Sequence, residues 1–255
     1  MTTGHGLDDK TLIVSGAAGA LGSAIVRAFV STGVRAVGLV DHDAAALRTT
    51  IANLHNEKGD VEFVAIPLDV TDHDAVHEAY RDFAVHVGGL DVAINNAGIV
   101  APSARLHNVR PEDFRRVLDV NLAGIFNCLQ ASIIEMRGRG GGSIVNTASV
   151  AGFTTWTHNS PYGVSKAGVI QLTKIAAAEY AKESIRVNCV CPGTFITSFH
   201  DEMPDGAMDG VLAKHPLGRF GTTDEIAAAY VYLAGNNATW ITGTSMVIDG
   251  GMSVG

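Results

Sequence analysis

The sequence predicts a single α/β domain built on a doubly wound, seven-stranded parallel sheet with helices on both faces. Short apolar runs alternate with helical patterns of about 10 to 20 residues. Because only a crossover brings the chain back in the same direction, this alternation predicts parallel pairing. The strands are almost wholly apolar, as expected where helices cover both sheet faces. The 255 residues fit one domain, since α/β units of about 250 residues often form one.

Composition and charge exclude several classes of protein. Apolar residues make up 47% of the chain and charged residues 17%, which suits a large core. A net charge of −8 without long runs of like charge argues against nucleic-acid or membrane-surface partners. No apolar run reaches about 18 residues, the first ten residues lack a secretory apolar segment, and three cysteines build no disulfide framework. We therefore expect a cytoplasmic protein with reduced thiols.

Strands and helices alternate through the first half of the chain. The predicted strands are short runs rich in β-branched residues, over Thr11–Ser15, Ala36–Val40, Val61–Leu68 and Leu90–Asn95. The helix over Leu21–Thr32 ends before Gly33, and the helix over about Ala44–Lys58 ends before Gly59. Glycine is the residue that most often ends helices in this way.

The same alternation continues with longer helices. Thr71 and Asp74 form a variant capping box that opens the third helix. Pro111 suits the first turn of a long helix that ends near Arg137, before the loop Gly138–Gly142. The remaining elements are the strands Ser143–Ala148, Ile185–Cys191 and Ser245–Ile248 and the helices Ser160–Lys182 and Thr222–Ala234, the last with Thr222 and Glu225 as its capping box.

One segment, Phe195–Lys214, breaks the alternation. It is long, follows a strand and contains Pro204, Gly206 and Gly210. Long connections of this kind in a compact domain are commonly functional loops. We expect a substrate lid over about residues 195–214.

The first strand ends in a glycine-rich turn, Ser15-Gly16-Ala17-Ala18-Gly19-Ala20-Leu21-Gly22, that runs straight into a helix. Small residues there let the backbone approach a pyrophosphate, whose charge a helix N-terminus stabilises. Asp41 ends the second strand, where a carboxylate can accept both ribose hydroxyls. The turn alone would be a weak signal, but strand, turn, helix and acid together predict dinucleotide binding.

A second motif, Tyr162-Gly163-Val164-Ser165-Lys166, lies at the start of a predicted helix. The spacing of four places the phenol and the ammonium on one helical face. A nearby cation stabilises phenolate and so lowers the tyrosine pKa from its ordinary value of about 10. An isolated pair of this kind is more often structural, but Ser149 ends a strand nearby, and ligands of doubly wound sheets gather at carboxyl strand ends.

Further motifs follow in sequence: Asp69-Val70, Asn95-Asn96-Ala97-Gly98, Val120-Asn121-Leu122, and Pro192-Gly193 with Thr197. Together with the turn and the Tyr162–Lys166 pair, they resemble the short-chain dehydrogenase/reductase family from about Leu7 to Gly251. The turn is similar to the family's T-G-x-x-x-G-x-G but differs at Ser15 and at Ala20, where the family usually has glycine. The resemblance implies a single-domain Rossmann fold and a homotetramer acting on a small molecule.

The resemblance also implies a nicotinamide cofactor and a catalytic tetrad. The residues expected to bind NAD are Gly16, Gly19, Ala20, Leu21, Gly22, Asp41, Asp69, Val70, Asn96, Ala97, Gly98, Tyr162, Lys166, Pro192, Gly193 and Thr197. Tyr162 would exchange the proton of the alcohol, and Ser149 would stabilise the substrate oxygen. Lys166 would lower the tyrosine pKa and hold the nicotinamide ribose, while Asn121 would anchor a relay water.

The expected reaction is NAD-dependent interconversion of a secondary alcohol and a ketone. Apolar residues predict a pocket for uncharged cyclic, aryl or medium-chain substrates, lined by Ala151, Phe153, Trp156, Phe195, Phe199 and Met203. One alternative is an NADPH-dependent reductase of acyl thioesters, which Asp41 opposes because it would repel a 2′-phosphate. The lid, with four acids against Lys214, also offers a poor dock for an acidic carrier. Another alternative is a non-catalytic dinucleotide sensor, against which the intact tetrad argues.

Two remaining clusters have ordinary interpretations. His73 and His77 share a helical face at a spacing that could bind a metal, but the surrounding acids favour a solvated surface, and we expect no metal. Cys189 and Cys191 point to one side of a predicted strand and are interpreted as small core residues.

Overall fold

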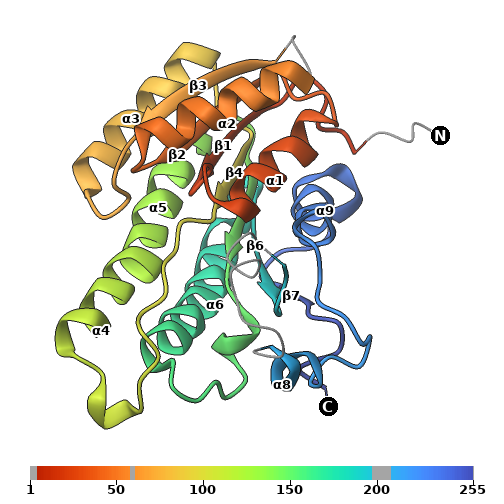
Figure 1. Cartoon of the computed structure of the whole chain (residues 1–255). Helices are drawn as coiled ribbons and strands as arrows, with labels where there is room; N and C mark the ends of the chain where they lie inside the picture. The colour runs from red at the N-terminus through yellow and green to blue at the C-terminus, as the bar shows by residue number, and fades with distance from the viewer. Residues whose placement is uncertain (1–4, 58–60, 197–207, 255) are drawn as a thin grey trace.

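The computed structural model describes residues 5–57, 61–196 and 208–254, and these form a three-layer α/β domain around one parallel sheet (Figure 1). The strand order is β3-β2-β1-β4-β5-β6-β7, and all neighbours pair in parallel. The strands are β1 Thr11–Ser15, β2 Ala36–Asp41, β3 Glu62–Pro67, β4 Val92–Asn95, β5 Gly142–Thr147, β6 Ile185–Pro192 and β7 Ser245–Ile248. This confirms the predicted fold class.

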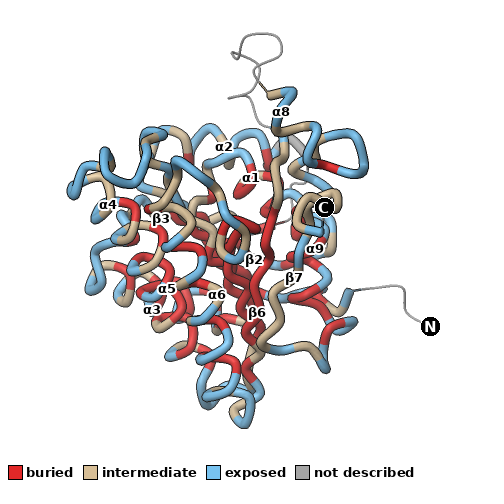
Figure 2. Tube along the Cα trace, turned by 90° about the horizontal axis from the view of Figure 1, so that it is seen from below, coloured by how far each residue is buried: buried red, intermediate tan, exposed pale blue. Residues whose placement is uncertain are grey.

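Helices cover both faces of the sheet. The α-helices of the described residues are α1 Ala20–Val30, α2 Ala44–Glu57, α3 His73–Val87, α4 Pro111–Leu118, α5 Ile125–Met136, α6 Ser160–Tyr180, α8 Asp209–Leu212 and α9 Thr223–Ala234. All of them except α4 and α8 pack on the sheet. One core cluster joins α1, α2 and α9 to the sheet, and a second joins α3, α5 and α6 to it. The buried residues therefore follow the strands and the inner helix faces, while the outer turns are exposed (Figure 2).

The strand order reverses between β1 and β4, which creates the crevice where doubly wound sheets bind ligands. A buried hydroxyl joins the two strand ends at this point. The Ser15 Oγ accepts hydrogen bonds from the backbone N–H of Asn96 at 3.0 Å and of Ala97 at 3.3 Å. The carboxyl ends of β1 and β4 are thus fixed relative to each other, and the glycine-rich turn leaves from this edge.

The long helix predicted from Pro111 to about Arg137 is interrupted. Residues Asp119–Gly124 form a π-helical turn between α4 and α5. Such turns commonly occur at functional sites, and this one carries Asn121. By length and mean hydropathy alone, Pro111–Met136 could cross a membrane, but 56% of its most apolar window is buried within the fold, as in a core helix.

The predicted cap of the third helix is wrong. The cap of α3 is Asp72, whose side chain accepts a hydrogen bond from the Ala75 N–H at 3.1 Å. The Thr71 hydroxyl instead donates a hydrogen bond to the Asp69 carboxylate. Thr71 therefore does not cap the helix. The strand β3 forms an edge of the sheet, and its residues are exposed or partly buried.

Candidate active site

The glycine-rich turn packs so closely that side chains have no room at two of its glycines. Gly16 has φ +65°, and a Cβ on Gly22 would lie 2.0 Å from the Gly16 carbonyl oxygen. Gly19, the N-cap of α1, and Ala20, its first residue, are both exposed, and no side chain of the described residues caps this helix end. Leu21 is buried in the core. An uncapped helix N-terminus beside small, exposed residues fits a pyrophosphate.

Asp41 ends β2 with its carboxylate directed at this turn. One carboxylate oxygen accepts the Ala18 N–H at 3.1 Å, and the other accepts the Asp43 N–H at 3.2 Å. The Asp41 side chain is only 11% exposed, and the His42 Nδ1 lies 3.0 Å from it. A carboxylate fixed at this point can accept ribose hydroxyls, and this role of Asp41 stays a prediction.

The turn after β4 is held from three sides. The Asn96 amide donates to the Gly16 carbonyl at 3.2 Å, and its Oδ1 accepts the Thr147 hydroxyl at 3.1 Å. Ala97 approaches Gly16, and a Cβ on Gly98 would lie 3.5 Å from the Lys166 Nζ. The predicted cofactor residues Asn96, Ala97 and Gly98 therefore lie between the glycine-rich turn and Lys166.

The Asp69-Val70 pair lies at the loop after β3. The Asp69 carboxylate accepts both the Thr71 N–H and the Thr71 hydroxyl at 2.9 Å. Val70 is buried against Gly124 of the π-helical turn, and its carbonyl accepts the Asn127 amide at 2.9 Å. These contacts fix the loop that the resemblance assigns to the adenine.

Lys166 is buried, with 2% of its surface exposed. Its Nζ donates to the Thr147 carbonyl at 2.7 Å and lies 5.6 Å from the centroid of the Tyr162 ring. Desolvation lowers the pKa of Lys166 to about 8. The ammonium thus lies at the carboxyl edge of the sheet, where α6, the end of β5 and the loop after β4 meet.

Asn121 is fully buried in the π-helical turn and clamps the loop after β4. Its Oδ1 accepts the Ile99 N–H at 2.7 Å, and its Nδ2 donates to the Ile99 carbonyl at 2.9 Å. The Nδ2 also lies 3.2 Å from the Ser165 Oγ. Since a Cβ on Gly98 would meet both Asn121 and Lys166, the two side chains border one small space.

Ser149 and Tyr162 complete the predicted tetrad. Ser149 is buried, and its Oγ accepts the Ala151 N–H at 3.2 Å. Burial raises the pKa of Tyr162, and a hydrogen bond with Ser149 acts in the opposite direction. The sequence predicts a lowered pKa through Lys166, but in this structure the ammonium donates to Thr147 and burial of the phenol prevails.

Residues after β6 are only partly within the described region. The Gly193 N–H donates to the Ile248 carbonyl at 2.9 Å, and a Cβ there would lie 2.7 Å from Asp249. The Pro192 carbonyl lies 3.5 Å from the Ser149 Oγ, so this segment borders the tetrad. The predicted cofactor residue Thr197 and the predicted pocket residues Phe199 and Met203 lie outside the described residues.

The other predicted pocket residues differ in exposure. Ala151 is buried, Phe153 is 51% exposed and Trp156 is partly buried, all on the segment that follows Ser149. Phe195 pairs with Gly221 in an isolated bridge and packs against the core cluster of α1 and α9. Phe195 therefore anchors the start of the predicted lid segment to the core.

Two residues that sequence reasoning passed over support this site. Thr147 holds Lys166 through its carbonyl and Asn96 through its hydroxyl. Ser15, treated above only as a departure from the family's turn, joins β1 to β4. A polar residue ending an otherwise apolar strand is the signal that could have found both.

The structure shows the surroundings of the two histidines and of the two cysteines. His73 and His77 are on the surface of α3, and each imidazole lies 3.1 Å from the Gln130 Oε1. Cys189 and Cys191 are fully buried beside Ile125 and Val169. Within residues 5–57, 61–196 and 208–254, no group of three or more potential ligands could hold a metal ion.

A family model described as enoyl-(acyl carrier protein) reductase matches residues 16–253. The chain belongs to the short-chain dehydrogenase/reductase family. Members of this family are oxidoreductases that bind a nicotinamide dinucleotide. The uncapped glycine-rich turn, Asp41 and the residues around Lys166 fit that cofactor.

Known relatives cover nearly the whole chain. The 3-oxoacyl-(acyl-carrier-protein) reductase of Thermotoga maritima is 35% identical over 97% of this chain and 99% of that protein. The cis-4-hydroxycyclohexanecarboxylate dehydrogenase of Sinomonas cyclohexanicum is 33% identical over 97% and 98%. The crystal structure of NAD⁺-bound xylitol dehydrogenase superposes with a TM-score of 0.92 at 30% identity, covering 96% of this chain and 99% of that one.

The crowding at Gly22 gives a first prediction. Gly22→Ala places a methyl group against backbone atoms of Gly16 and Ala17, and such overpacking costs about 1–3 kcal/mol. Gly19→Ala is the matched control, because its Cβ would lie 3.5 Å from the nearest atom, an ordinary contact. Thermal unfolding should show a lowered Tm for Gly22→Ala alone; equal Tm values for the two variants would contradict this packing.

Tyr162→Phe tests the acid/base. The variant should keep its fold and its dinucleotide affinity, because only one hydroxyl is removed. Turnover at saturating substrate should fall about 10²- to 10⁴-fold, the usual contribution of positioned proton transfer. Tyr180→Phe, a partly buried position at the end of α6, controls for loss of a hydroxyl. If Tyr162→Phe retained more than about a tenth of the activity, another group would be the acid/base.

Lys166→Met separates function from stability. The pKa of Lys166 is about 8 in the folded protein and about 10.4 in the unfolded chain. Below pH 8 its buried charge therefore lowers the free energy of unfolding, and this loss disappears as the pH rises above 10. At pH 7 the variant should therefore unfold at an equal or higher temperature, although turnover falls and the pH optimum of oxidation moves upward. Lys174→Met, an exposed position on the same helix, is the control. A clear loss of stability at pH 7 in Lys166→Met alone would contradict a destabilising buried charge.

Proposed function

We propose that the protein is an NAD(H)-dependent oxidoreductase that interconverts a secondary alcohol and a ketone. The observation that carries this proposal is the convergence of four side chains, Asn121, Ser149, Tyr162 and Lys166, at the sheet edge that also holds Asp41 and the glycine-rich turn. The dehydrogenases and reductases among the relatives support it.

Each side chain has a role that its contacts permit. In ketone reduction, the Tyr162 hydroxyl gives its proton to the substrate oxygen, and in alcohol oxidation it takes that proton back. The Ser149 hydroxyl donates a hydrogen bond to the same oxygen as negative charge develops on it. The dinucleotide, when bound, supplies or accepts the hydride.

Lys166 and Asn121 act behind these groups. The Lys166 ammonium lies on the ring side of Tyr162, where its charge favours the phenolate that forms during oxidation. Asn121 orders the loop of Gly98 and Ile99 and keeps a polar group beside the ammonium. The resemblance places a relay water at Asn121, and its buried amide is suitably located to hold one.

The preference for NAD follows from the charge of Asp41. A 2′-phosphate would bring about −1.5 to −2 charges to this carboxylate. At 4 Å and an effective dielectric constant of about 20, each unit pair costs about 4 kcal/mol before screening and relaxation reduce it. A remaining 2 to 3 kcal/mol would give about a 30- to 150-fold preference for NAD. The neighbouring positions hold Ala17, Ala18 and His42, with no lysine or arginine among them.

This charge argument is tested by exchanging the local charges. Asp41→Ser combined with His42→Arg removes the carboxylate and supplies a guanidinium for a 2′-phosphate. The ratio of kcat/KM values for NAD and NADP should narrow or reverse, while the Tyr162-dependent step is unaffected. His42→Arg alone is the control for a general change in charge. Comparable kcat/KM values for NAD and NADP in the unmodified enzyme at pH 7.5 would refute the assignment.

The substrate class is inferred from the residues that follow Ser149 and Pro192. Phe153, Trp156 and Phe195, with Phe199 and Met203 by sequence, favour burial of an apolar group at about 0.8 kcal/mol per methylene. Arg105 and Lys214 are the only basic residues that the sequence places nearby, so a charged substrate has few partners. We infer an uncharged cyclic, aryl or medium-chain ketone or secondary alcohol.

A matched substrate pair tests this inference. Cyclohexanol and cis-4-hydroxycyclohexanecarboxylate share a ring and a secondary alcohol, and the second compound is the one named for the Sinomonas relative. We expect the higher kcat/KM for cyclohexanol and its uncharged derivatives, measured with NAD by absorbance of the reduced nicotinamide. A clear preference for the carboxylate would overturn the inference, and Arg105→Gln would then show whether Arg105 pairs with it.

The second candidate function is NADPH-dependent reduction of an acyl thioester. The name of the Thermotoga relative and the description of the family model favour it. The negative charge of Asp41 disfavours binding of NADPH. The acidic side chains from Asp201 to Asp209 likewise disfavour binding of an acidic carrier protein. Oxidation of NADPH by acetoacetyl-coenzyme A, faster than any turnover with NADH and a simple ketone, would select this function.

We also infer a homotetramer that acts in the cytoplasm. Large apolar side chains are exposed on two regions, the long helices and the C-terminal part of the chain. They are Phe126, Ile134, Val164 and Ile175 on α5 and α6, and Tyr232, Trp240, Val247 and Val254 toward the C-terminus. Exposed apolar patches of this kind commonly mark subunit interfaces, and the fully exposed Trp240 indole supports a contact there.

A further inference from the structure

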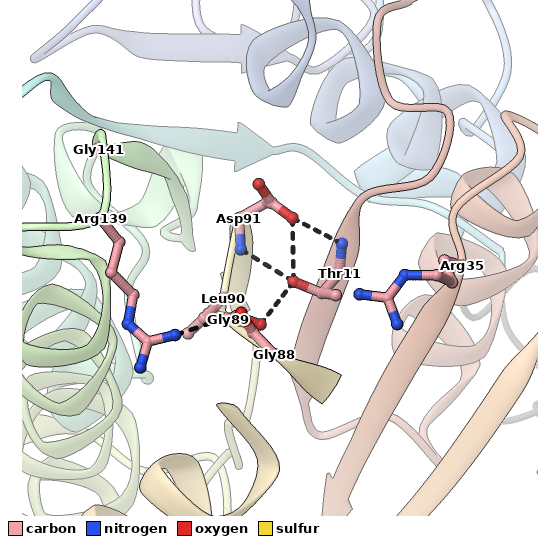
Figure 3. Close-up of a pocket in the computed structure, with 8 residues that line it drawn as sticks. All are labelled: Thr11, Arg35, Gly88, Gly89, Leu90, Asp91, Arg139 and Gly141. Carbon is pink, nitrogen blue, oxygen red and sulfur yellow. Dashed lines mark hydrogen bonds between the residues drawn. The ribbon is translucent and has the colours of Figure 1, made fainter. Parts of the chain in front are cut away.

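A second pocket lies at the edge of the sheet opposite the active site, where strands begin rather than end. We name it the amino-edge pocket. It is a cavity of about 130 Å³ lined by Thr11, Arg35, Gly88, Gly89, Leu90, Asp91, Arg139 and Gly141 (Figure 3). These residues come from the start of β1, the connection before β2, the α3–β4 connection and the α5–β5 connection. None of these residues is among the catalytic and cofactor-binding residues proposed above.

Two arginines flank this pocket and retain most of their donors. The Arg35 guanidinium donates to the Val87 carbonyl at 2.7 Å, and the Arg139 guanidinium donates to the Gly88 carbonyl at 3.3 Å. Figure 3 shows the two groups on either side of the Gly88–Leu90 segment. A guanidinium has five N–H donors in a fixed fork, so both groups can bind a further acceptor. Asp9, at 3.7 Å from Arg35, is a largely exposed partner and contributes little.

The one carboxylate in the lining is already neutralised. The Asp91 side chain accepts the Lys10 ammonium at 2.9 Å and the Thr11 N–H at 2.9 Å. Desolvation of Asp91 opposes these bonds, but Lys10 and Thr11 prevail and lower its pKa. Asp91 therefore repels an anion less than its formal charge suggests, and the pocket carries a net positive charge in a chain of net charge −8.

Two backbone N–H groups of the lining residues are also without an acceptor among the described residues. Within the described part of the chain, no group accepts a hydrogen bond from the Gly89 or Leu90 N–H. Gly88 and Gly89 have φ values of +80° and +150°, which turn the chain sharply at the pocket. Unpaired N–H groups at such turns commonly bind anions. The cavity holds about four waters at about 30 Å³ each, room enough for one tetrahedral oxyanion.

We propose that the amino-edge pocket binds a phosphate group, held by Arg35 and Arg139 and by the backbone of the Gly88–Leu90 turn. Arginine pairs with phosphate oxygens through two parallel N–H···O bonds, which are stronger than bonds between neutral groups. Bound phosphate would join the α3–β4 connection to the α5–β5 connection, residues 137–141. Its binding should therefore also resist unfolding of the chain.

Calorimetric titration with inorganic phosphate tests the site in the enzyme saturated with NAD, at constant ionic strength. NAD occupies the glycine-rich turn, so phosphate cannot be counted there. We expect one phosphate per chain with a millimolar Kd, and at least a tenfold weaker Kd in Arg139→Gln and in Arg35→Gln. Arg81→Gln, an exposed ion-paired arginine on α3, is the matched control and should stay within twofold of the unmodified protein.

Opposite results would overturn the site. No phosphate binding to the NAD-saturated enzyme, or binding that both pocket variants retain, would contradict it. Adenosine monophosphate in place of phosphate distinguishes the source of the group. If adenosine monophosphate and inorganic phosphate bind with equal Kd values, the site takes free phosphate. If adenosine monophosphate binds with the lower Kd, and this Kd depends on Arg139, the site takes the phosphate of a nucleotide. Thermal unfolding with phosphate against chloride gives an independent readout, since only the intact pocket should show a phosphate-specific rise in Tm.

Discussion

The ammonium of Lys166 is buried at the carboxyl edge of the sheet, and its single described hydrogen bond is to the Thr147 carbonyl. Burying a charge is costly unless the surroundings hold it, so the neighbouring elements are arranged around this group. The end of β5 supplies Thr147, and the loop after β4 supplies Gly98, at which any side chain would approach the Nζ. Burial lowers the pKa of Lys166 to about 8, so the group keeps most of its positive charge at pH 7, beside the ring of Tyr162.

The strand order explains how this arrangement is reached. The reversal between β1 and β4 opens the crevice, and the Ser15 hydroxyl locks the two strand ends together. The π-helical turn then brings Asn121 to the loop after β4, where a continuous α-helix would rotate it away from Ile99. The candidate dinucleotide site and the predicted tetrad thus lie at one edge of one sheet. The amino-edge pocket lies at the opposite edge and uses loops that the catalytic chemistry leaves free.

The sequence predicts the sheet, its helices and the cluster of site residues because these depend on periodicity and on strand ends. Apolar runs such as Ile185–Cys191 and glycines such as Gly16 leave local signals that a single sequence carries. The π-helical turn within Pro111–Met136 leaves no such signal, since its residues are compatible with an ordinary helix. The direction of the Tyr162 pKa was also mispredicted, because it depends on burial and on where the Lys166 ammonium points, and both are set by tertiary packing.

The most direct test of this account is the pKa of Lys166 itself. Lysine side chains labelled with ¹⁵N, observed by NMR while the pH is raised in the intact protein, report each ammonium separately, and the spectrum of Lys166→Met assigns the signal. The account predicts that this one lysine titrates near pH 8, while exposed lysines titrate near their ordinary value of about 10.4. A Lys166 signal that titrates with the exposed lysines would contradict the buried charge on which the site depends.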